Sequence, residues 1–172
     1  NFKAKVVALE GKSTPKSVAE KVLTLMTHYR VKSNDVVVDS FGQGANVSQE
    51  IALAHGGRVV ALNVGEQADD NERFANRRAE LYWKFREWIL KGGKLVKHKD
   101  WEQLLNIRYK RTLSGKIQIM PKQEMIKKGW DSPDVADAGM LSCLGDSSAS
   151  YSGGGTRGLS DNEIADIVNI YG

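Results

Sequence analysis

The sequence has only one cysteine, Cys143, and three histidines among its 172 residues. A single cysteine excludes an intrachain disulfide and fits a reducing compartment. His28, His55 and His98 are scattered and show none of the Cys/His spacings that hold zinc, so we interpret them as surface residues. No apolar run approaches the roughly 18 residues of a membrane-spanning helix, and the first residues show no signal-peptide pattern. We therefore expect a soluble protein without a membrane partner.

The composition is ordinary for a globular protein, with 41% hydrophobic and 27% charged residues. A net charge of +4 permits a polyanionic partner without requiring one. We predict one domain over residues 1–145, a flexible Ser/Gly-rich linker over 146–160 and a short amphipathic segment over 161–172. Because the chain begins without methionine, we expect it to be part of a longer polypeptide.

Strand-like and helix-like segments alternate along the first half of the chain, which favours crossover units and a largely parallel sheet. A long helix is expected near residues 73–91, with Tyr82 on its buried side and Arg78 on the remainder. Residues 107–120 read as a β-hairpin whose first strand is basic. The expected strands are Ala4–Leu9, Val36–Val38 and Arg58–Leu62, and the expected helices between them begin after Thr14 and near Val47.

Three aspartates are the most informative polar residues. Asp134 and Asp137 lie three residues apart in an expected first helical turn, with Ser132 as the predicted N-cap and Pro133 as the first helical residue. Two acids there can simply stabilise the helix, because their negative charges interact favourably with the positive end of the helix dipole. Asp39 ends a buried strand on a separate element. Acids on separate elements that converge would suit a hard divalent cation, which prefers carboxylate oxygens.

Three sequence runs in this order carry a family resemblance: VVVDSFGQGANV, FANRRAELYWKFREWI and IQIMPKQEMIKKGWDSPDVADA. Between Val36 and Met140 the chain resembles the C-terminal nuclease domain of the large terminase subunit of tailed bacteriophages. The resemblance implies a ribonuclease H-like α/β fold, a mixed sheet flanked by helices with a basic β-hairpin. It also implies cleavage of concatemeric double-stranded viral DNA during genome packaging.

The same resemblance assigns roles to particular residues. Asp39 and Asp134 are the implied ligands of Mg²⁺ or Mn²⁺, with two ions expected, and Asp137 is either a ligand or a group that supports one. Lys122 matches a lysine position of the family and could touch the scissile phosphate or a carboxylate, although a solvated lysine is an equal alternative. The family's first metal-binding aspartate lies on a central strand that is absent from these 172 residues. We therefore expect an upstream strand, or else a neighbouring segment, to supply it.

The implied partners are double-stranded DNA, an upstream ATPase domain of the same polypeptide, the portal protein and the small terminase subunit. The expected location is the packaging complex in the host cytoplasm. Arg108, Lys110 and Arg111 could follow a DNA backbone by neutralising phosphates. An exposed edge strand also carries charges merely to avoid aggregation. The run Asn76-Arg77-Arg78 matches the family and could equally serve helix packing.

Two hypotheses from other classes stay open at this point. A Rossmann-like nucleotide-binding domain would share the crossover order, but the turn Gly42-Gln43-Gly44 lacks the third glycine of a dinucleotide site and the lysine of a P-loop. A non-catalytic docking module of the packaging motor would explain the Ser/Gly-rich stretch and the amphipathic end. The Rossmann-like hypothesis gives no reason for Asp134 and Asp137 or for the basic hairpin, whereas the docking hypothesis predicts partner binding that survives loss of every acid.

Overall fold

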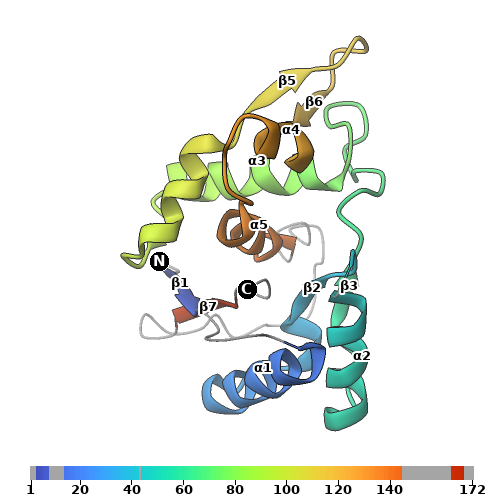
Figure 1. The fold of residues 1–172 in the computed structure, drawn as a ribbon, viewed down its shortest axis with the longest axis vertical. Coiled ribbons are helices and arrows are strands. Elements are labelled where there is room, and N and C mark those ends of the chain that lie inside the picture. The colour runs from blue at the N-terminus through green and yellow to red at the C-terminus, as the bar shows by residue number, and fades with distance from the viewer. Residues whose placement is uncertain (1–2, 8–13, 43, 145–163, 169–172) are drawn as a thin grey trace. The chain divides into compact units, whose positions relative to one another are not determined.

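The computed structural model describes residues 3–7, 14–42, 44–144 and 164–168 (Figure 1). The chain divides into two compact units, one formed by residues 1–6 and 65–167 and the other by residues 7–64 and 168–172. Among the described residues, no helix has both the length and the apolar character needed to cross a membrane.

The smaller unit begins with helix α1 (Pro15–Tyr29), whose first turn is specified by its sequence. The Thr14 hydroxyl accepts a hydrogen bond from the Ser17 amide at 3.2 Å, and the Ser17 side chain accepts from the Thr14 amide at 2.9 Å. This reciprocal pair satisfies two amides that the helix leaves without partners. The helix ends at Tyr29, and the C-cap residue Arg30 has a φ of 55° that turns the chain out of the helix.

A parallel strand pair and a crossover helix complete this unit. After the short 3-10 helix η1 (Ser33–Asp35), strand β2 (Val37–Asp39) leads into helix α2 (Gly44–His55) and strand β3 (Val60–Leu62). The strands pair in parallel, with Val38 opposite Ala61. The apolar faces of α1, β2 and α2 form one buried core, which contains Val18, Ala19, Val22, Met26, Val38, Val47 and Ile51. The predicted strand–helix–strand order is therefore confirmed here.

The junction between β2 and α2 is unusually close-packed at its backbone. A Cβ atom on Gly44 would lie 1.8 Å from the carbonyl oxygen of Asp39, closer than any real contact. Only glycine therefore fits at the first residue of α2. This approach fixes where the helix begins relative to the strand end that carries Asp39.

In the larger unit, helix α3 (Arg77–Leu90) packs against helix α5 (Asp134–Leu141) and against the 3-10 helix η2 (Lys99–Asn106). The fully buried Phe85 of α3 lies 6.2 Å from Trp101 of η2, measured between ring centroids. A Cβ on Gly139 of α5 would lie 2.7 Å from the Phe85 ring. The missing side chain of Gly139 therefore lets α5 approach α3 closely.

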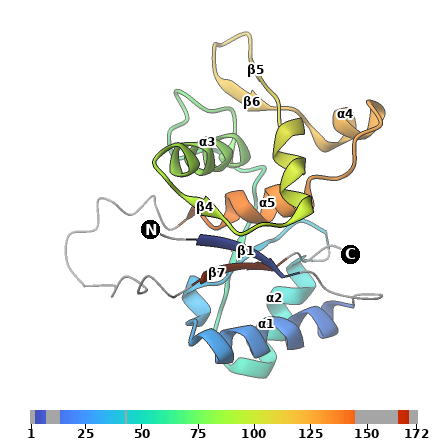
Figure 2. The same ribbon diagram turned by 90° about the vertical axis from the view of Figure 1, so that its left-hand side faces the viewer.

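Two small sheets belong mainly to this unit. Strand β1 (Lys3–Val7) lies between β4 (Lys94–Leu95) and β7 (Ile164–Val168), and its pairing with β4 is parallel (Figure 2). Strands β5 (Tyr109–Arg111) and β6 (Ile117–Ile119) form the predicted antiparallel hairpin, which projects beyond α3 and the short helix α4 (Lys122–Lys127) in Figure 1.

Two sequence-based boundaries differ from the structure or lie outside it. The long helix begins at Arg77 rather than near residue 73, because the preceding segment pairs with β6 instead, and the Ala75 amide donates to the Ile117 carbonyl at 2.9 Å. The predicted linker over 146–160 lies outside the described residues. Of the predicted segment over 161–172, the structure describes the backbone of β7 alone.

Replacing Gly44 by alanine should destabilise the protein strongly, by about 3 kcal/mol or more, because the added methyl group meets a backbone oxygen that no rotamer change can move away. Gly56, just after the other end of α2, is the matched control, since it has a φ of 67° and no heavy atom within 4 Å of an added Cβ. Gly56→Ala should lose only about 1–2 kcal/mol from its left-handed backbone. Urea denaturation measures both losses, and equal values would contradict the close approach at Gly44.

A candidate active site on helix α5

Helix α5 begins at Asp134, and this start differs from the predicted one. The expected N-cap, Ser132, is wrong: the cap position is occupied by Pro133, whose side chain offers no acceptor. Pro133 has a ψ of 50°, so the helix starts one residue later than predicted. The Ser132 hydroxyl instead donates to Oδ1 of Asp134 at 2.6 Å. The serine therefore orients the carboxylate rather than capping the helix.

A side chain from a distant element caps α5 instead. Oε1 of Gln103 on η2 accepts hydrogen bonds from the amides of Val135 at 2.9 Å and Ala136 at 3.3 Å. These two amides belong to the first turn, where a helix has no internal acceptors. Gln103 thus satisfies the helix terminus and fixes the position of the turn that carries Asp134.

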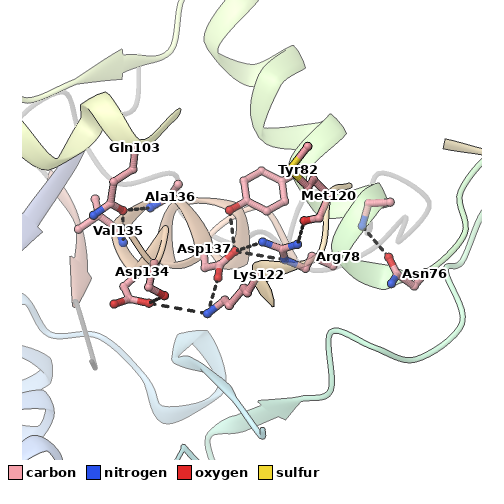
Figure 3. A network of polar contacts seen from close by, with 12 residues as sticks. Asn76, Arg78, Tyr82, Gln103, Met120, Lys122, Asp134, Val135, Ala136 and Asp137 are labelled. Carbon is pink, nitrogen blue, oxygen red and sulfur yellow. Dashed lines mark hydrogen bonds and ion pairs between the residues drawn. The ribbon is translucent and has the colours of Figure 1, made fainter. Parts of the chain in front are cut away.

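Asp137, the second acid of α5, is buried, and two polar side chains of α3 contact it (Figure 3). Its Oδ1 accepts from Nε and Nη2 of Arg78 at 3.3 and 3.1 Å, and from the Tyr82 hydroxyl at 2.6 Å. Arg78 and Tyr82 are four residues apart and lie on one helix face. Burial, and next the charge of Asp137, raise the pKa of Tyr82 well above its usual value. The phenol therefore keeps its proton and acts as a hydrogen-bond donor.

Lys122, the first residue of α4, lies between the two acids of α5. Its Nζ is 2.7 Å from Oδ2 of Asp137 and 3.7 Å from Oδ1 of Asp134 (Figure 3). The segment just before α4 is held in place as well, because Nη1 of Arg78 donates a hydrogen bond to the carbonyl oxygen of Met120 at 3.0 Å. The structure thus brings three sequence-predicted site residues, Asp134, Asp137 and Lys122, into one cluster.

The two acids of α5 differ in how accessible their carboxylates are to an ion from solvent. The Asp134 side chain is 23% exposed and can be reached by an ion from solvent, whereas that of Asp137 is 10% exposed. Both oxygens of Asp137 already face cationic groups, Arg78 on one side and Lys122 on the other. Within the described residues, no group of three or more His, Cys, Asp or Glu side chains is close enough to hold a metal ion.

Asp39, the remaining predicted ligand, belongs to the other compact unit. It is the last residue of β2, as the sequence predicted, and its Oδ1 accepts from the Phe41 amide at 3.0 Å. This contact orients the carboxylate at the carboxyl end of a parallel strand. That Asp39 joins Asp134 in one site stays a prediction.

The run Asn76-Arg77-Arg78 has three separate structural roles. Asn76 caps α3 by accepting from the Ala79 amide at 3.0 Å. Arg77 forms ion pairs with Asp69 in the preceding loop and with the buried Glu80, and its hydrogen bond lowers the pKa of Asp69. Arg78 binds Asp137 and its side chain is only 11% exposed, although the sequence analysis placed it on the outer part of the helix. Its spacing from the buried Tyr82 was the available signal for an inward position.

The three basic hairpin residues are exposed on and beside β5. Arg108 lies over the Trp130 ring, with 5.8 Å between its guanidinium carbon and the ring centroid. Lys110 is 4.0 Å from a carboxylate oxygen of Glu124, and Arg111 donates to a carbonyl in the hairpin turn at 2.9 Å. These contacts leave the charges accessible to a polyanion. Their role in DNA binding stays a prediction.

Gln103→Ala should lower the free energy of unfolding by about 0.5–2 kcal/mol, the usual range for removing a helix N-cap. The exposed Gln123 of α4 offers a matched control, because Gln123→Ala removes the same amide group from the surface. Thermal or urea denaturation compares the two variants. If both lose the same stability, the capping role of Gln103 is wrong.

Comparison with known proteins gives matches among solved structures alone, since no protein-family model and no curated protein matches the sequence. The nuclease domain of the large terminase subunit gp2 of bacterial virus Sf6 aligns with a TM-score of 0.60 at 21% identity, over 72% of this chain and 70% of that one. A lysine-to-alanine variant of the same domain, solved with manganese, matches with the same values.

A further structure of that variant, with manganese and β-thujaplicinol, aligns with a TM-score of 0.61 at 20% identity, over 74% of this chain and 71% of that one. A likeness at this level of identity establishes the fold. The fold expected from the sequence resemblance is therefore confirmed: the chain has the ribonuclease H-like α/β fold of the terminase nuclease domain.

Proposed function

We propose that the chain is a divalent-metal-dependent endonuclease that cleaves double-stranded DNA during bacteriophage genome packaging. The fold shared with the Sf6 terminase nuclease domain is the observation that carries this proposal. A second observation supports it: the partly exposed carboxylate of Asp134 lies at the start of α5, which Gln103 caps, and is 3.7 Å from Nζ of Lys122 on α4. The ammonium of Lys122 can attract a phosphate, and the carboxylate of Asp134 can bind a metal ion, so the pair suits chemistry on a phosphodiester.

Asp39 and Asp134 are the proposed metal ligands, and Mg²⁺ or Mn²⁺ the proposed ions. The solved Sf6 structures that contain manganese support this choice, as does the oxygen-only donor set of the two aspartates. Two such ions would activate water and stabilise the leaving oxygen. Lys122 would contribute a fixed positive charge that attracts the scissile phosphate.

The proposed substrate contact is the β5–β6 hairpin. Arg108, Lys110 and Arg111 are exposed and would neutralise phosphates on either strand of a duplex. Contacts of this kind read no bases, so the proposed cleavage has low sequence preference. An upstream ATPase domain, the portal protein and the small terminase subunit are the proposed partners, in the cytoplasm of the host cell.

Asp39→Asn and Asp134→Asn should each abolish Mn²⁺-dependent nicking of a supercoiled plasmid by the complete natural polypeptide, because each removes a ligand oxygen. Manganese should also raise the melting temperature of the wild type more than that of either variant. Asp131→Asn is the matched control, since it removes the same charge from an exposed residue three positions before Asp134.

The control should nick like the wild type. Without metal, Asp134→Asn should lose no more than about 2 kcal/mol of unfolding free energy, because it loses a helix-dipole contribution and a partly exposed ion pair with Lys122, each worth up to about 1 kcal/mol. Full nicking activity in Asp134→Asn would mean that this acid serves the helix terminus and nothing else.

Replacing Arg108, Lys110 and Arg111 together by alanine should weaken duplex binding equally for all sequences. The slope of log K against log salt should fall by up to about 2.7, because as many as three phosphate contacts are lost. A triple alanine variant of Lys16, Lys21 and Lys32 is the control, since these exposed lysines lie on other elements and carry the same total charge. Fluorescence anisotropy at several salt concentrations measures both. If both variants lose the same duplex affinity, the effect of the hairpin comes from the net charge of the protein and not from contacts with DNA.

A further inference from the structure

The outer side of helix α3 carries aromatic, apolar and arginine side chains that the proposed nuclease chemistry does not use. Trp83, Arg86 and Leu90 recur at three- and four-residue spacing, so they lie along one stripe of the helix. Arg78 and Tyr82, which contact helix α5, lie on a different stripe. Leu90 is 68% exposed, and Arg86 is exposed as well. The outer stripe therefore faces solvent.

The indole ring of Trp83 is the centre of a cluster of ring contacts. The guanidinium carbons of Arg73 and Arg86 each lie 5.2 Å from the centroid of this ring. The Tyr109 ring of β5 meets it edge-on, with 5.6 Å between the ring centroids. These contacts hold the two guanidinium groups at the surface of the protein. We call the resulting surface the α3–β5 face, and it is formed by Arg73, Trp83, Arg86, Leu90 and Tyr109.

The α3–β5 face combines exposed apolar surface with an excess of positive charge. The Tyr109 side chain is 58% exposed, and that of Arg73 is 49% exposed. Glu87 lies 3.9 Å from Arg73 and accepts a hydrogen bond from Nε1 of Trp83. Within the described part of the chain, Arg86 contacts the Trp83 ring and forms no ion pair. Its guanidinium is therefore available to an anionic group from outside.

The β5–β6 hairpin separates the α3–β5 face from the candidate active site. Successive residues of a strand point to opposite sides, so Tyr109 and Lys110 project in opposite directions. Tyr109 meets Trp83 of α3, whereas Lys110 is 4.0 Å from Glu124 of α4, the helix whose first residue belongs to the candidate site. Arg111, on the same side as Tyr109, donates to a carbonyl of the hairpin turn. DNA at the candidate site would therefore follow the α4 side of the hairpin.

We propose that the α3–β5 face binds an acidic segment of a partner protein that also carries an apolar side chain. Tryptophan, tyrosine and arginine are the residue types that contribute most to binding between proteins. The two arginines can donate paired hydrogen bonds to carboxylates of the segment. Leu90 and Tyr109 offer apolar surface beside them. This docking role goes beyond the proposed nuclease function and does not depend on it.

The same contacts favour a protein over a nucleic acid as the occupant. A base of a single strand stacks on an open aromatic ring, but two guanidinium groups already lie over the Trp83 ring. A duplex offers its charged backbone, which gains little from burying the apolar surface of Leu90 and Tyr109. A peptide supplies both carboxylates for the arginines and an apolar side chain for this surface.

The experiment uses the complete natural polypeptide with two labelled probes, a short peptide of glutamates around one leucine and a DNA duplex. Fluorescence anisotropy measures the affinity for each probe. Arg73→Gln combined with Arg86→Gln removes both arginines of the α3–β5 face. Arg108→Gln combined with Lys110→Gln is the matched control, since it removes the same charge from residues outside this face. Arg86→Glu is a second test variant, because this exposed side chain makes a ring contact and no ion pair among the described residues.

For both test variants we expect peptide affinity to fall about tenfold and duplex affinity to stay within about twofold of the wild type. The control variant should show the reverse, because it loses phosphate contacts. A peptide with glutamine in place of glutamate should bind the wild type about tenfold more weakly than the acidic peptide. Unlabelled duplex should leave the acidic peptide bound, because the two probes occupy different sides of the hairpin.

Displacement of the peptide by duplex would overturn the proposal in favour of a DNA-binding face, as would equal losses of peptide and duplex affinity in Arg86→Glu. Peptide affinity that is the same in the wild type and in Arg86→Glu would also overturn it. A wild type that binds the peptide and no duplex would overturn the proposed nuclease function instead, and the peptide measurements would still decide the docking role.

Discussion

The buried ion pair between Arg78 and Asp137 is the interaction on which the candidate site depends. Both side chains are about nine-tenths buried, and they join α3 to α5 across a separation of 59 residues. Removing one partner of such a pair typically costs about 3–5 kcal/mol, because the other charge stays buried without compensation. The same guanidinium also holds the Met120 carbonyl, just before Lys122. One arginine thereby sets the relative positions of both acids and the lysine.

The parts of the fold that the sequence predicted are those with local physical causes. Thr14 and Pro15 specify a helix start because the cap and the fixed φ act within four residues. The alternation of apolar strands and helices predicts the β2–α2–β3 unit, and the turn near Gly115 predicts the hairpin. Asp39 was placed correctly at the end of its strand, since the strand's apolar run ends there.

The parts that sequence reasoning missed depend on contacts between distant residues. Gln103 caps α5 across 32 residues, and no local pattern distinguishes it from any other polar residue of a helical turn. Ser132 looked like a cap because its neighbours have the composition of a helix start. Arg78 looked exposed because arginine usually is, and only its spacing from Tyr82 indicated the buried face. The set of metal ligands depends on how separate elements converge, which local patterns do not encode.

Hydrogen bonds on both sides of the β5–β6 hairpin determine where the sequence and length of this domain can vary. Before the hairpin, the side chain of Gln103 accepts a hydrogen bond from α5, and after it the carbonyl of Met120 accepts one from Arg78 of α3. Strand β6 is tied to the same unit as well, because Ile117 is buried and pairs with the segment before α3. The turn between β5 and β6 is therefore the part whose length and surface chemistry can change while the rest of the hairpin stays in place. Related chains can be expected to vary there first, since insertions in such a loop cost little closure entropy and leave the carboxylates undisturbed.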